Sequence, residues 1–257
     1  MSWRVSDKDG LLVRSGDDPF VRCEVAPDGV GLAGPLGWAV LSPAERDRAG
    51  AVVVLDVEPD EARGRDLVRR LTSLAQDEGR RLAWIVTEGG IELPLGEPWQ
   101  LGAHWVWMSA TSVSSPPENR WSLIELDDDS DAEEIAAFAV PINPLFEGDP
   151  GQGRTRLWLG ARDASGTLIA CGAVHETPAG VGHLAGVVVA PEYRRKGLGR
   201  AIVLGLSRAV LASDGVVTLS AYADNTSAIR LYLGLGYRLE HAFVSRFREP
   251  RRAASGQ

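Results

Sequence analysis

The stretch of residues 183–203 constrains the fold of this chain more than any other part of it. It begins with an apolar, β-branched run at residues 184–190, which is typical of a buried strand. Pro191 has no N–H to donate to a sheet and therefore ends that strand. A basic turn follows, and apolar residues then recur at helical spacing from Ile202 to Val210. The stretch predicts a strand, a basic glycine-containing turn and an amphipathic helix.

The turn before this helix has the composition of an anion-binding site. The start of a helix leaves four backbone N–H groups without partners, at the positive end of the helix dipole. Gly197 and Gly199 have no Cβ, so an anion can approach the backbone closely. Arg194, Arg195 and Lys196 add positive charge at the same place. These residues alone predict phosphate binding, but they also fit an ordinary strand–turn–helix connection with a solvated basic cap.

Two motifs together point to a known family. The pattern Arg194-x-x-Gly197-x-Gly199 differs from the Walker A loop and from the dinucleotide-binding GxGxxG. It resembles the pyrophosphate loop of the GCN5-related N-acetyltransferase (GNAT) superfamily, which binds acetyl-CoA. A second block downstream resembles the second motif of that family, with Asn225, Ala228, Leu231, Tyr232, Gly236 and Tyr237 at the matching positions. Because both motifs occur in the family's order, the chain is identified as a member.

The resemblance implies a fold and a cofactor site. The fold is α/β (an α+β mixed sheet), in which two parallel central strands splay apart and the pantetheine arm of acetyl-CoA lies in the gap. No metal is expected. Asn225 is expected to orient the cofactor, although it also suits a simple helix N-cap. The implied cofactor-binding residues are Val187, Val188, Val189, Arg194, Arg195, Lys196, Gly197, Leu198, Gly199, Arg200 and Asn225.

The resemblance also implies direct attack of an amine on the thioester, without an acyl-enzyme. Tyr232 is then the general acid, because a tyrosine of pKa about 10 keeps its proton at neutral pH; the alternative is a tyrosine that only packs on the sheet. His183 is the candidate general base, with Glu176, His175 or a water molecule as alternatives. Cys171 lies among apolar residues with no activating base nearby in the sequence, so it is interpreted as a core residue.

Composition bears on the expected partners and location of the protein. With 44% hydrophobic and 24% charged residues, the chain is expected to be globular. No apolar run approaches the length of a membrane span, so no membrane partner is expected. With a net charge of -8, nucleic acid is not an expected partner, because neutralising its phosphates needs a basic face. Two cysteines are too few for a disulfide framework and suit a reducing cytoplasm. The expected location is therefore cytoplasmic, and a homodimer is left open.

The first half of the chain repeats the pattern of the second in weaker form. A hairpin is expected from Phe20–Val25 and Trp38–Leu41 across the turn at Pro27 to Gly29. A buried strand at residues 51–57, an amphipathic helix at 67–75 and a strand at 81–87 follow. This order matches the expected order in the second half, which indicates an internal repeat.

The first copy lacks the features that would bind a cofactor. Aligning Pro59 with Pro191 shortens the turn and sets Asp66 in the place of Gly199, where a carboxylate would repel a pyrophosphate. No Asn/Tyr block follows the strand at 81–87. We therefore expect a truncated, structural GNAT-like half at residues 1–118, a linker-like stretch at 112–119, a catalytic domain at 119–249 and a disordered tail at 250–257.

The remaining elements of the second half follow from local patterns. A strand at 121–126, an acidic helix start at 127–134 and a Pro- and Gly-rich loop at 141–153 come first, and Glu147 and Asp149 of this loop are candidates for contacting a cationic amine. Further elements are expected at residues 156–161, 168–174 and 216–222 (strands), 225–233 (helix) and 237–247 (strand).

Three functions remain open at this stage. The favoured one is an N-acetyltransferase that moves an acetyl group from acetyl-CoA to a primary amine of a small molecule or an amino-acid derivative. The second is acetylation of a protein or peptide amine. The third is a non-catalytic acyl-CoA sensor, against which the intact loop and Tyr232 argue.

Overall fold

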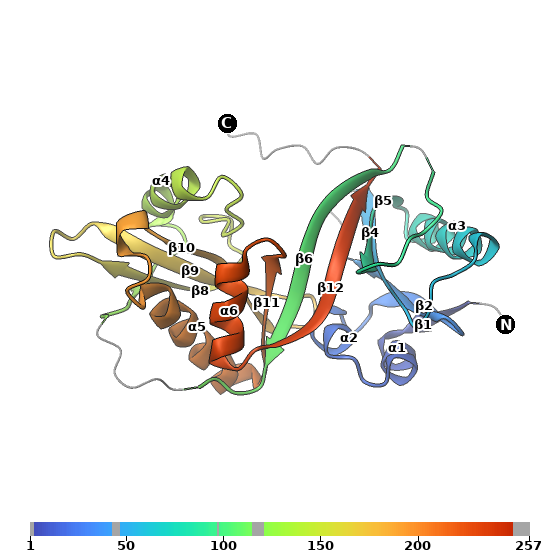
Figure 1. Ribbon diagram of the computed structural model, residues 1–257, viewed down its shortest axis with the longest axis horizontal. Coiled ribbons are helices and arrows are strands. Elements are labelled where there is room, and N and C mark those ends of the chain that lie inside the picture. Colours follow the sequence, from blue (N-terminus) through green and yellow to red (C-terminus); the bar gives the residue numbers. More distant parts are fainter. Residues whose placement is uncertain (1–2, 43–46, 97, 115–120, 249–257) are drawn as a thin grey trace. The chain divides into compact units, whose positions relative to one another are not determined.

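The computed structural model describes residues 3–42, 47–96, 98–114 and 121–248 (Figure 1). Their contacts form two compact units. The first contains the chain up to Trp107, together with Tyr222–Asp224 and the chain from Glu240. The second contains Met108–Ala221 and Asn225–Leu239.

The first unit is a mixed sheet with helices on both faces. Its strands lie in the order β1-β2-β3-β4-β5-β12-β6, and the greater part of β6 and of β12 belongs to this unit. The elements are β1 (Arg4–Asp7), α1 (Lys8–Ser15), α2 (Pro19–Glu24), β2 (Val30–Gly34), β3 (Gly37–Ser42), β4 (Arg48–Leu55), α3 (Glu61–Asp77), β5 (Arg81–Glu88), β6 (Gln100–Ala110) and β12 (Arg238–Phe247).

One helical crossover sets the direction of β5 relative to β4. Strands β1 to β4 pair antiparallel. Strands β4 and β5 are parallel, because α3 returns the chain to the end of the sheet at which β4 begins. The apolar face of α3, with Leu67 and Leu71, packs against β4 and β5. On the other face of the sheet, Leu11 of α1 lies over Gly31. The final strand, β12, pairs antiparallel with β5.

The expected hairpin of Phe20–Val25 with Trp38–Leu41 is wrong in its first strand. Residues from Pro19 to Glu24 form helix α2, whose N-cap Asp18 accepts a hydrogen bond from the N–H of Phe20. Proline at the first helical position supports this start because its missing N–H would have had no partner there. The turn at Pro27 exists, but it connects α2 to β2, and β2 pairs with β3.

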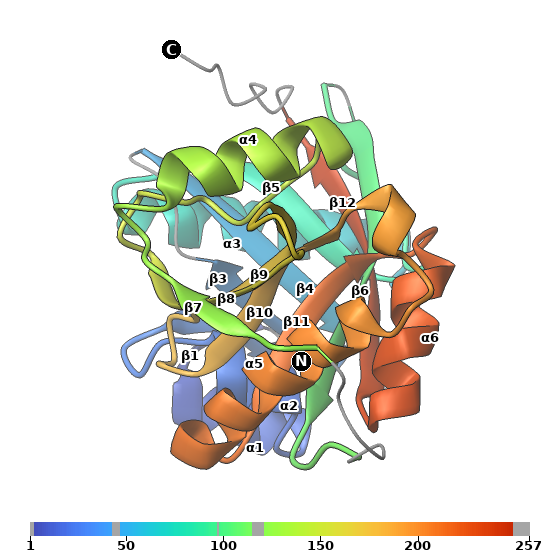
Figure 2. The same ribbon diagram turned by 90° about the vertical axis from the view of Figure 1, so that its left-hand side faces the viewer.

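The second unit is also a mixed sheet, with strands in the order β7-β8-β9-β10-β11. Helix α5 packs on β8, β9 and β10, and α4 lies on the opposite face of the same strands (Figure 2). The elements are β7 (Ile124–Leu126), α4 (Ala132–Ile142), β8 (Thr155–Arg162), β9 (Leu168–Glu176), β10 (Gly182–Val189), a 3-10 turn (Pro191–Tyr193), α5 (Leu198–Asp214), β11 (Val217–Tyr222) and α6 (Thr226–Leu235).

Two boundaries in the second unit differ from the expectation. The strand expected from Trp121 begins only at Ile124, and α4 continues through Pro141, where a loop was expected to begin. Sequence patterns place the ends of elements poorly because terminal turns depend on contacts made elsewhere in the fold.

Both units use the same topology, as the expected internal repeat requires. In each, antiparallel strands lead to a parallel pair joined by a crossover helix, which is α3 between β4 and β5 and α5 between β10 and β11. Between β5 and β6, the described residues form no helix corresponding to α6. The mixed α/β fold is therefore as expected, and the first copy is the shorter one.

The expected division of the chain can be compared with the units only in part. The boundary at 118/119 and the tail at 250–257 lie outside the described residues. The chain from Glu240 belongs to the first unit, because β12 pairs with β5 from Phe243 to Phe247. The expected domain of residues 119–249 had included this strand in the catalytic half.

Candidate active site

The turn between β10 and α5 has the backbone of an anion site. After the 3-10 turn, Arg195 and Gly197 both adopt positive φ angles, 59° and 86°. Helix α5 then begins at Leu198, and Gly197 provides no side-chain cap. Among the described residues, the first N–H groups of α5 therefore have neither an intrahelical partner nor a capping side chain. This arrangement suits a bound anion at the helix N-terminus.

The two glycines of the turn serve different purposes. The positive φ of Gly197 would strain any residue with a side chain. At Gly199, by contrast, the one described atom that an added Cβ would meet is Val189 Cγ2, at an ordinary contact distance of 3.4 Å. The protein itself does not require glycine at this second position. A ligand that approaches the backbone closely would require it.

Surrounding side chains hold the turn and leave it positively charged. The side chain of Arg194 donates from Nε to the carbonyl of Val189 at 3.1 Å. The ammonium of Lys196 lies 5.1 Å from the ring centroid of Tyr193. The Trp121 indole donates to the carbonyl of Lys196 at 3.1 Å, which the motif did not indicate. Arg195 is exposed, and Arg200 buries an Nε that has no hydrogen-bond partner within the described chain.

The parallel strands beside this turn separate early. Within the described residues, strands β10 and β11 pair at two positions, His183↔Thr218 and Leu184↔Leu219. Beyond Leu184, β10 keeps its antiparallel partner β9 through a register shift between Ala185 and Val188. The edge of β10 at Val187 to Val189 thus has no described ladder partner on the β11 side, so its backbone groups can bind an extended ligand.

The second motif forms the start and body of α6. Asn225 caps this helix by accepting a hydrogen bond from the N–H of Ala228 at 3.2 Å. Tyr232 is buried, and desolvation raises the pKa of its hydroxyl to about 12. No hydrogen bond within the described residues engages this hydroxyl. The neighbouring Tyr237 differs, because its hydroxyl lies 2.6 Å from Ser207 Oγ.

The candidate bases lie at the start of β10 and the end of β9. His183 is half-buried, and its Nδ1 lies 2.8 Å from Thr218 Oγ1. His175 is its cross-strand neighbour, and His175 Nε2 lies 3.0 Å from the carbonyl of Gly148. Since a carbonyl only accepts, this nitrogen of His175 carries the proton. Glu176 is exposed, with a carboxylate oxygen 3.8 Å from Arg156 Nη1.

Other polar residues of the second unit are used structurally. Cys171 is fully buried, and desolvation raises the pKa of its thiol to about 12, which confirms the core interpretation. Asp149 lies 3.8 Å from the guanidinium of Arg154, and Glu147 lies in the same loop. Contact of either carboxylate with an amine stays a prediction. The described residues contain no group of three or more His, Cys, Asp and Glu that could hold a metal ion.

In the first unit, a side chain of the protein occupies the equivalent helix start. The Asp60 carboxylate caps α3 by accepting from the N–H of Arg63 at 2.9 Å. Helix α3 begins two residues after Pro59, whereas α5 begins seven residues after Pro191. The expected alignment of Asp66 with Gly199 is therefore wrong. Asp66 lies within α3 and pairs with Arg69 and Arg70, whose hydrogen bonds lower the pKa of its carboxyl group.

Comparison with known proteins agrees with this geometry. Residues 116–237 match the model of the acetyltransferase (GNAT) family. No curated protein matches the chain. None of the helices in the described part of the chain combines the length and apolar character that a membrane crossing requires.

Solved structures of low sequence identity share the fold. A GCN5-related N-acetyltransferase from Kribbella flavida is 18% identical over 95% of both chains, with a TM-score of 0.55. One from Sphaerobacter thermophilus is 17% identical over 96% of both chains, with a TM-score of 0.55. A GNAT-family acetyltransferase from Colwellia psychrerythraea is 12% identical over 97% of this chain and 100% of its own, with a TM-score of 0.53. Over residues 116–237, this chain therefore matches the acetyltransferase (GNAT) family.

Proposed function

We propose that the second unit transfers an acetyl group from acetyl-CoA to a primary amine of a small molecule or an amino-acid derivative. The observation that carries this proposal is the uncapped start of α5 at Gly197, beside strands β10 and β11, which part after Leu184. A diphosphate suits the helix start, and an extended arm suits the open edge of β10. The free thiols of Cys23 and Cys171 suit a reducing, cytoplasmic location.

The residues of the turn and of β10 would hold the donor. The N–H groups at the start of α5 would bind its diphosphate, with positive charge from Arg194, Arg195 and Lys196. The backbone of Val187 to Val189 would hydrogen-bond its pantetheine arm, and an N–H of this edge would stabilise charge on a thioester oxygen. Acetyl-CoA supplies the activated acyl group and a thiolate leaving group.

Two side chains would move protons. Tyr232 keeps its proton at physiological pH, because burial raises the pKa of its hydroxyl to about 12, and it would donate that proton to the departing sulfur. His183 would accept a proton from the attacking amine. With a general acid and a general base in place, the amine can attack directly, without an acyl-enzyme.

A free-thiol release assay with acetyl-CoA tests the reaction. Panels of small amines, amino acids, polyamines and peptides separate the proposed acceptors from a protein or peptide acceptor. A protein that binds CoA but releases no thiol with any panel would instead support the sensor alternative.

Donor binding is tested separately by calorimetric titration of acetyl-CoA into Gly199→Asp. We expect binding to be lost, because the new carboxylate would oppose the phosphates at the helix start. The fold should persist, since an acidic residue is favourable in the first turn of a helix. Gly199→Asn, which has the same size without the charge, is the matched control and should retain more affinity. Unchanged affinity in folded Gly199→Asp would contradict the proposed site.

A further inference from the structure

The loop between α4 and β8, residues 143–153, touches the segment of β10 that has parted from β11. Gly186 lies two residues beyond Leu184, the last described residue of β10 that pairs with β11. Its φ is +58°, and an added Cβ would lie 2.8 Å from the Cα of Gly148 and 3.3 Å from its nitrogen. Glycine at position 186 therefore lets the backbones of the loop and of β10 meet where the edge of β10 is open.

The thioester of the proposed donor would lie beside this contact. Its diphosphate suits the start of α5, which follows the end of β10. The arm would then run along Val187 to Val189, back toward Gly186, with the thioester at its far end. An amine that attacks the thioester would consequently bind next to the 143–153 loop.

Gly148 is the point at which the middle of the loop is attached to the sheet. It is buried, whereas its neighbours Glu147 and Asp149 are exposed. Its carbonyl oxygen lies 3.0 Å from Nε2 of His175, near the end of β9, and this nitrogen donates because a carbonyl only accepts. Loss of the donor would leave the carbonyl of a buried residue unsatisfied, which costs more than the net gain from an ordinary hydrogen bond.

The far end of the loop is held by a different residue. The carboxylate of Asp128, in the turn before α4, accepts from the N–H groups of Gly151 and Gly153 at 3.3 and 2.9 Å. It also accepts from the indole of Trp158 on β8 at 2.8 Å. These three bonds do not involve His175. Loss of its side chain should therefore free the middle of the loop and leave residues 151–153 in place.

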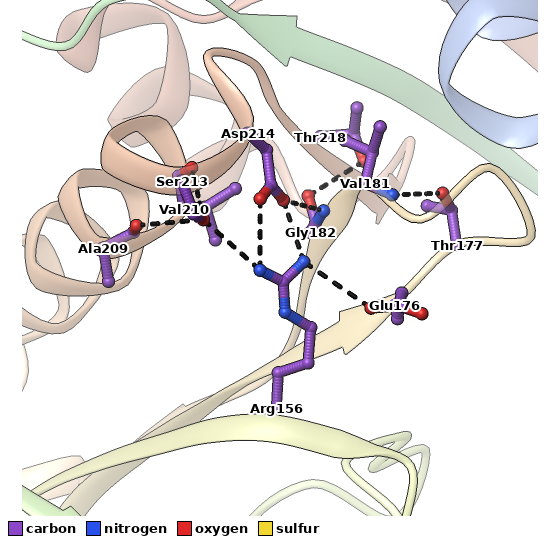
Figure 3. Close-up of polar contacts among 10 residues, drawn as sticks. All are labelled: Arg156, Glu176, Thr177, Val181, Gly182, Ala209, Val210, Ser213, Asp214 and Thr218. Carbon is purple, nitrogen blue, oxygen red and sulfur yellow. Dashed lines mark hydrogen bonds and ion pairs between the residues drawn. The ribbon is translucent and has the colours of Figure 1, made fainter.

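The strands that carry this contact are also held without His175 (Figure 3). Arg156 of β8 donates to both carboxylate oxygens of Asp214, at the end of α5, at 2.8 and 3.1 Å. The same carboxylate accepts from the N–H of Gly182, the first residue of β10, at 2.7 Å. A change at Arg156 therefore weakens the same sheet without removing the bond to Gly148, so it is a control for a general loss of stability.

We infer that His175 is a positioning residue that holds the 143–153 loop against Gly186 of β10, so that the loop forms one wall of the site for the amine. The inference rests on the proposed function only in assigning that use to the loop. His175 acts through the carbonyl of Gly148. Its role requires a hydrogen-bond donor at the Nε2 position and does not require a basic nitrogen.

Hydrogen–deuterium exchange followed by mass spectrometry tests the attachment of the loop without any substrate. His175→Phe keeps a planar ring but has no donor, so we expect the amides of residues 143–149 to exchange faster than in the wild-type protein. The variant should fold, because His175 is only half-buried. His175→Gln places an amide N–H near the former Nε2 and should restore the wild-type rate, and Arg156→Gln should leave this rate unchanged. Wild-type exchange in His175→Phe would overturn the inference.

Kinetics tests the use of the loop, with the amine that reacts best in the thiol-release panels. We expect His175→Phe to raise the KM for the amine roughly 2- to 10-fold, the effect of one hydrogen bond, with a smaller change in kcat. The affinity for acetyl-CoA should stay near that of the wild type, because the proposed diphosphate site lies beyond the other end of β10.

Two control variants separate this role from the alternatives. His175→Gln should restore the KM for the amine and keep the acidic limb of the pH–rate profile, whereas loss of that limb would make His175 the base and contradict the inference. Arg156→Gln should lower thermal stability and keep the KM for the amine. An equal rise of this KM in Arg156→Gln would attribute the effect to general destabilisation and would also contradict the inference.

The inference and the proposed function fail in different ways. If no amine releases thiol, the proposed function fails, and the exchange measurement still decides whether His175 holds the loop. If His175→Phe frees the loop but leaves the KM for a reacting amine unchanged, the loop is not a wall of the amine site. The inference then fails while the proposed function stands.

Discussion

At the scale of single residues, Tyr232 and Tyr237 show how one kind of side chain takes two roles. Their rings lie 5.9 Å apart, and burial raises both hydroxyl pKa values above the usual range. The Tyr237 hydroxyl forms a buried hydrogen bond with Ser207 and therefore has a structural role. The Tyr232 hydroxyl has no such bond within the described residues, and its raised pKa keeps it protonated at any pH used for assays.

Tyr232→Phe should therefore lower turnover by roughly 10²- to 10⁴-fold with little change in acetyl-CoA affinity, because only the proton donor is lost. Steady-state kinetics and calorimetric titration measure the two effects. Tyr237→Phe is the control, and it should lower thermal stability more than turnover, since it breaks the bond to Ser207. Near-normal turnover in Tyr232→Phe would assign the general acid to another group.

At the scale of elements, the starts of α3 and α5 separate a structural crossover helix from one suited to binding. Both helices join parallel strands, yet Asp60 caps α3, whereas no side chain in the described part of the chain caps α5. The longer turn before α5 also provides positive-φ residues at Arg195 and Gly197, which turn the backbone toward an incoming anion.

We accordingly expect one acetyl-CoA site per chain, located in the second unit. Calorimetric titration of the wild-type protein should give a stoichiometry of one. Asp60→Ala should leave this stoichiometry unchanged, because the short turn before α3 cannot wrap a diphosphate even without the cap. It should lower stability by about 1 kcal/mol through loss of the cap. Two sites per chain, or residual binding at the first unit in Gly199→Asp, would contradict the expectation.

At the scale of the whole molecule, the chain does not divide into two consecutive halves. The end of the chain belongs to the first unit, where strand β12 lies between β5 and β6. His241 of this strand contacts two carboxylates, because its Nδ1 lies 2.6 Å from Glu88 Oε2 and its Nε2 lies 3.1 Å from Asp18 Oδ1. Its ring stacks on Phe243 and meets Phe20 edge-on. Burial alone would lower the pKa of His241, but the two carboxylates outweigh it and raise the pKa to about 9.

The stability of the first unit should therefore fall at alkaline pH. Because the folded pKa lies above the unfolded value of about 6.5, the stabilisation is complete below pH 6.5. It is lost as the pH rises through about 9, and it amounts to roughly 3 kcal/mol in total. Urea unfolding followed by tryptophan fluorescence between pH 6 and 10 measures this slope.

His241→Gln should flatten the pH dependence of stability. His104→Gln is the control, because it changes an exposed histidine of the same unit and should keep the slope. If the slope is the same in His241→Gln and in the wild type, the charge on His241 does not stabilise the fold.

The sequence by itself determined the parts of the site that depend on neighbouring residues. The turn with Gly197 and Gly199, the helix that follows it and the Asn225 cap all arise within a few residues, so spacing and residue type predict them. Tertiary structure alone decided the rest. The Thr218–His183 bond spans 35 residues and the Asp18–His241 bond spans 223, and no local pattern encodes either pairing.

The helix at residues 19–24 was missed because its apolar residues also suit a strand. Packing of Phe20 against Trp38, Trp107 and Phe243 decides which face of this segment is buried. The place of β12 was missed because a strand pattern predicts that a segment pairs, whereas the available sheet edge decides its partner.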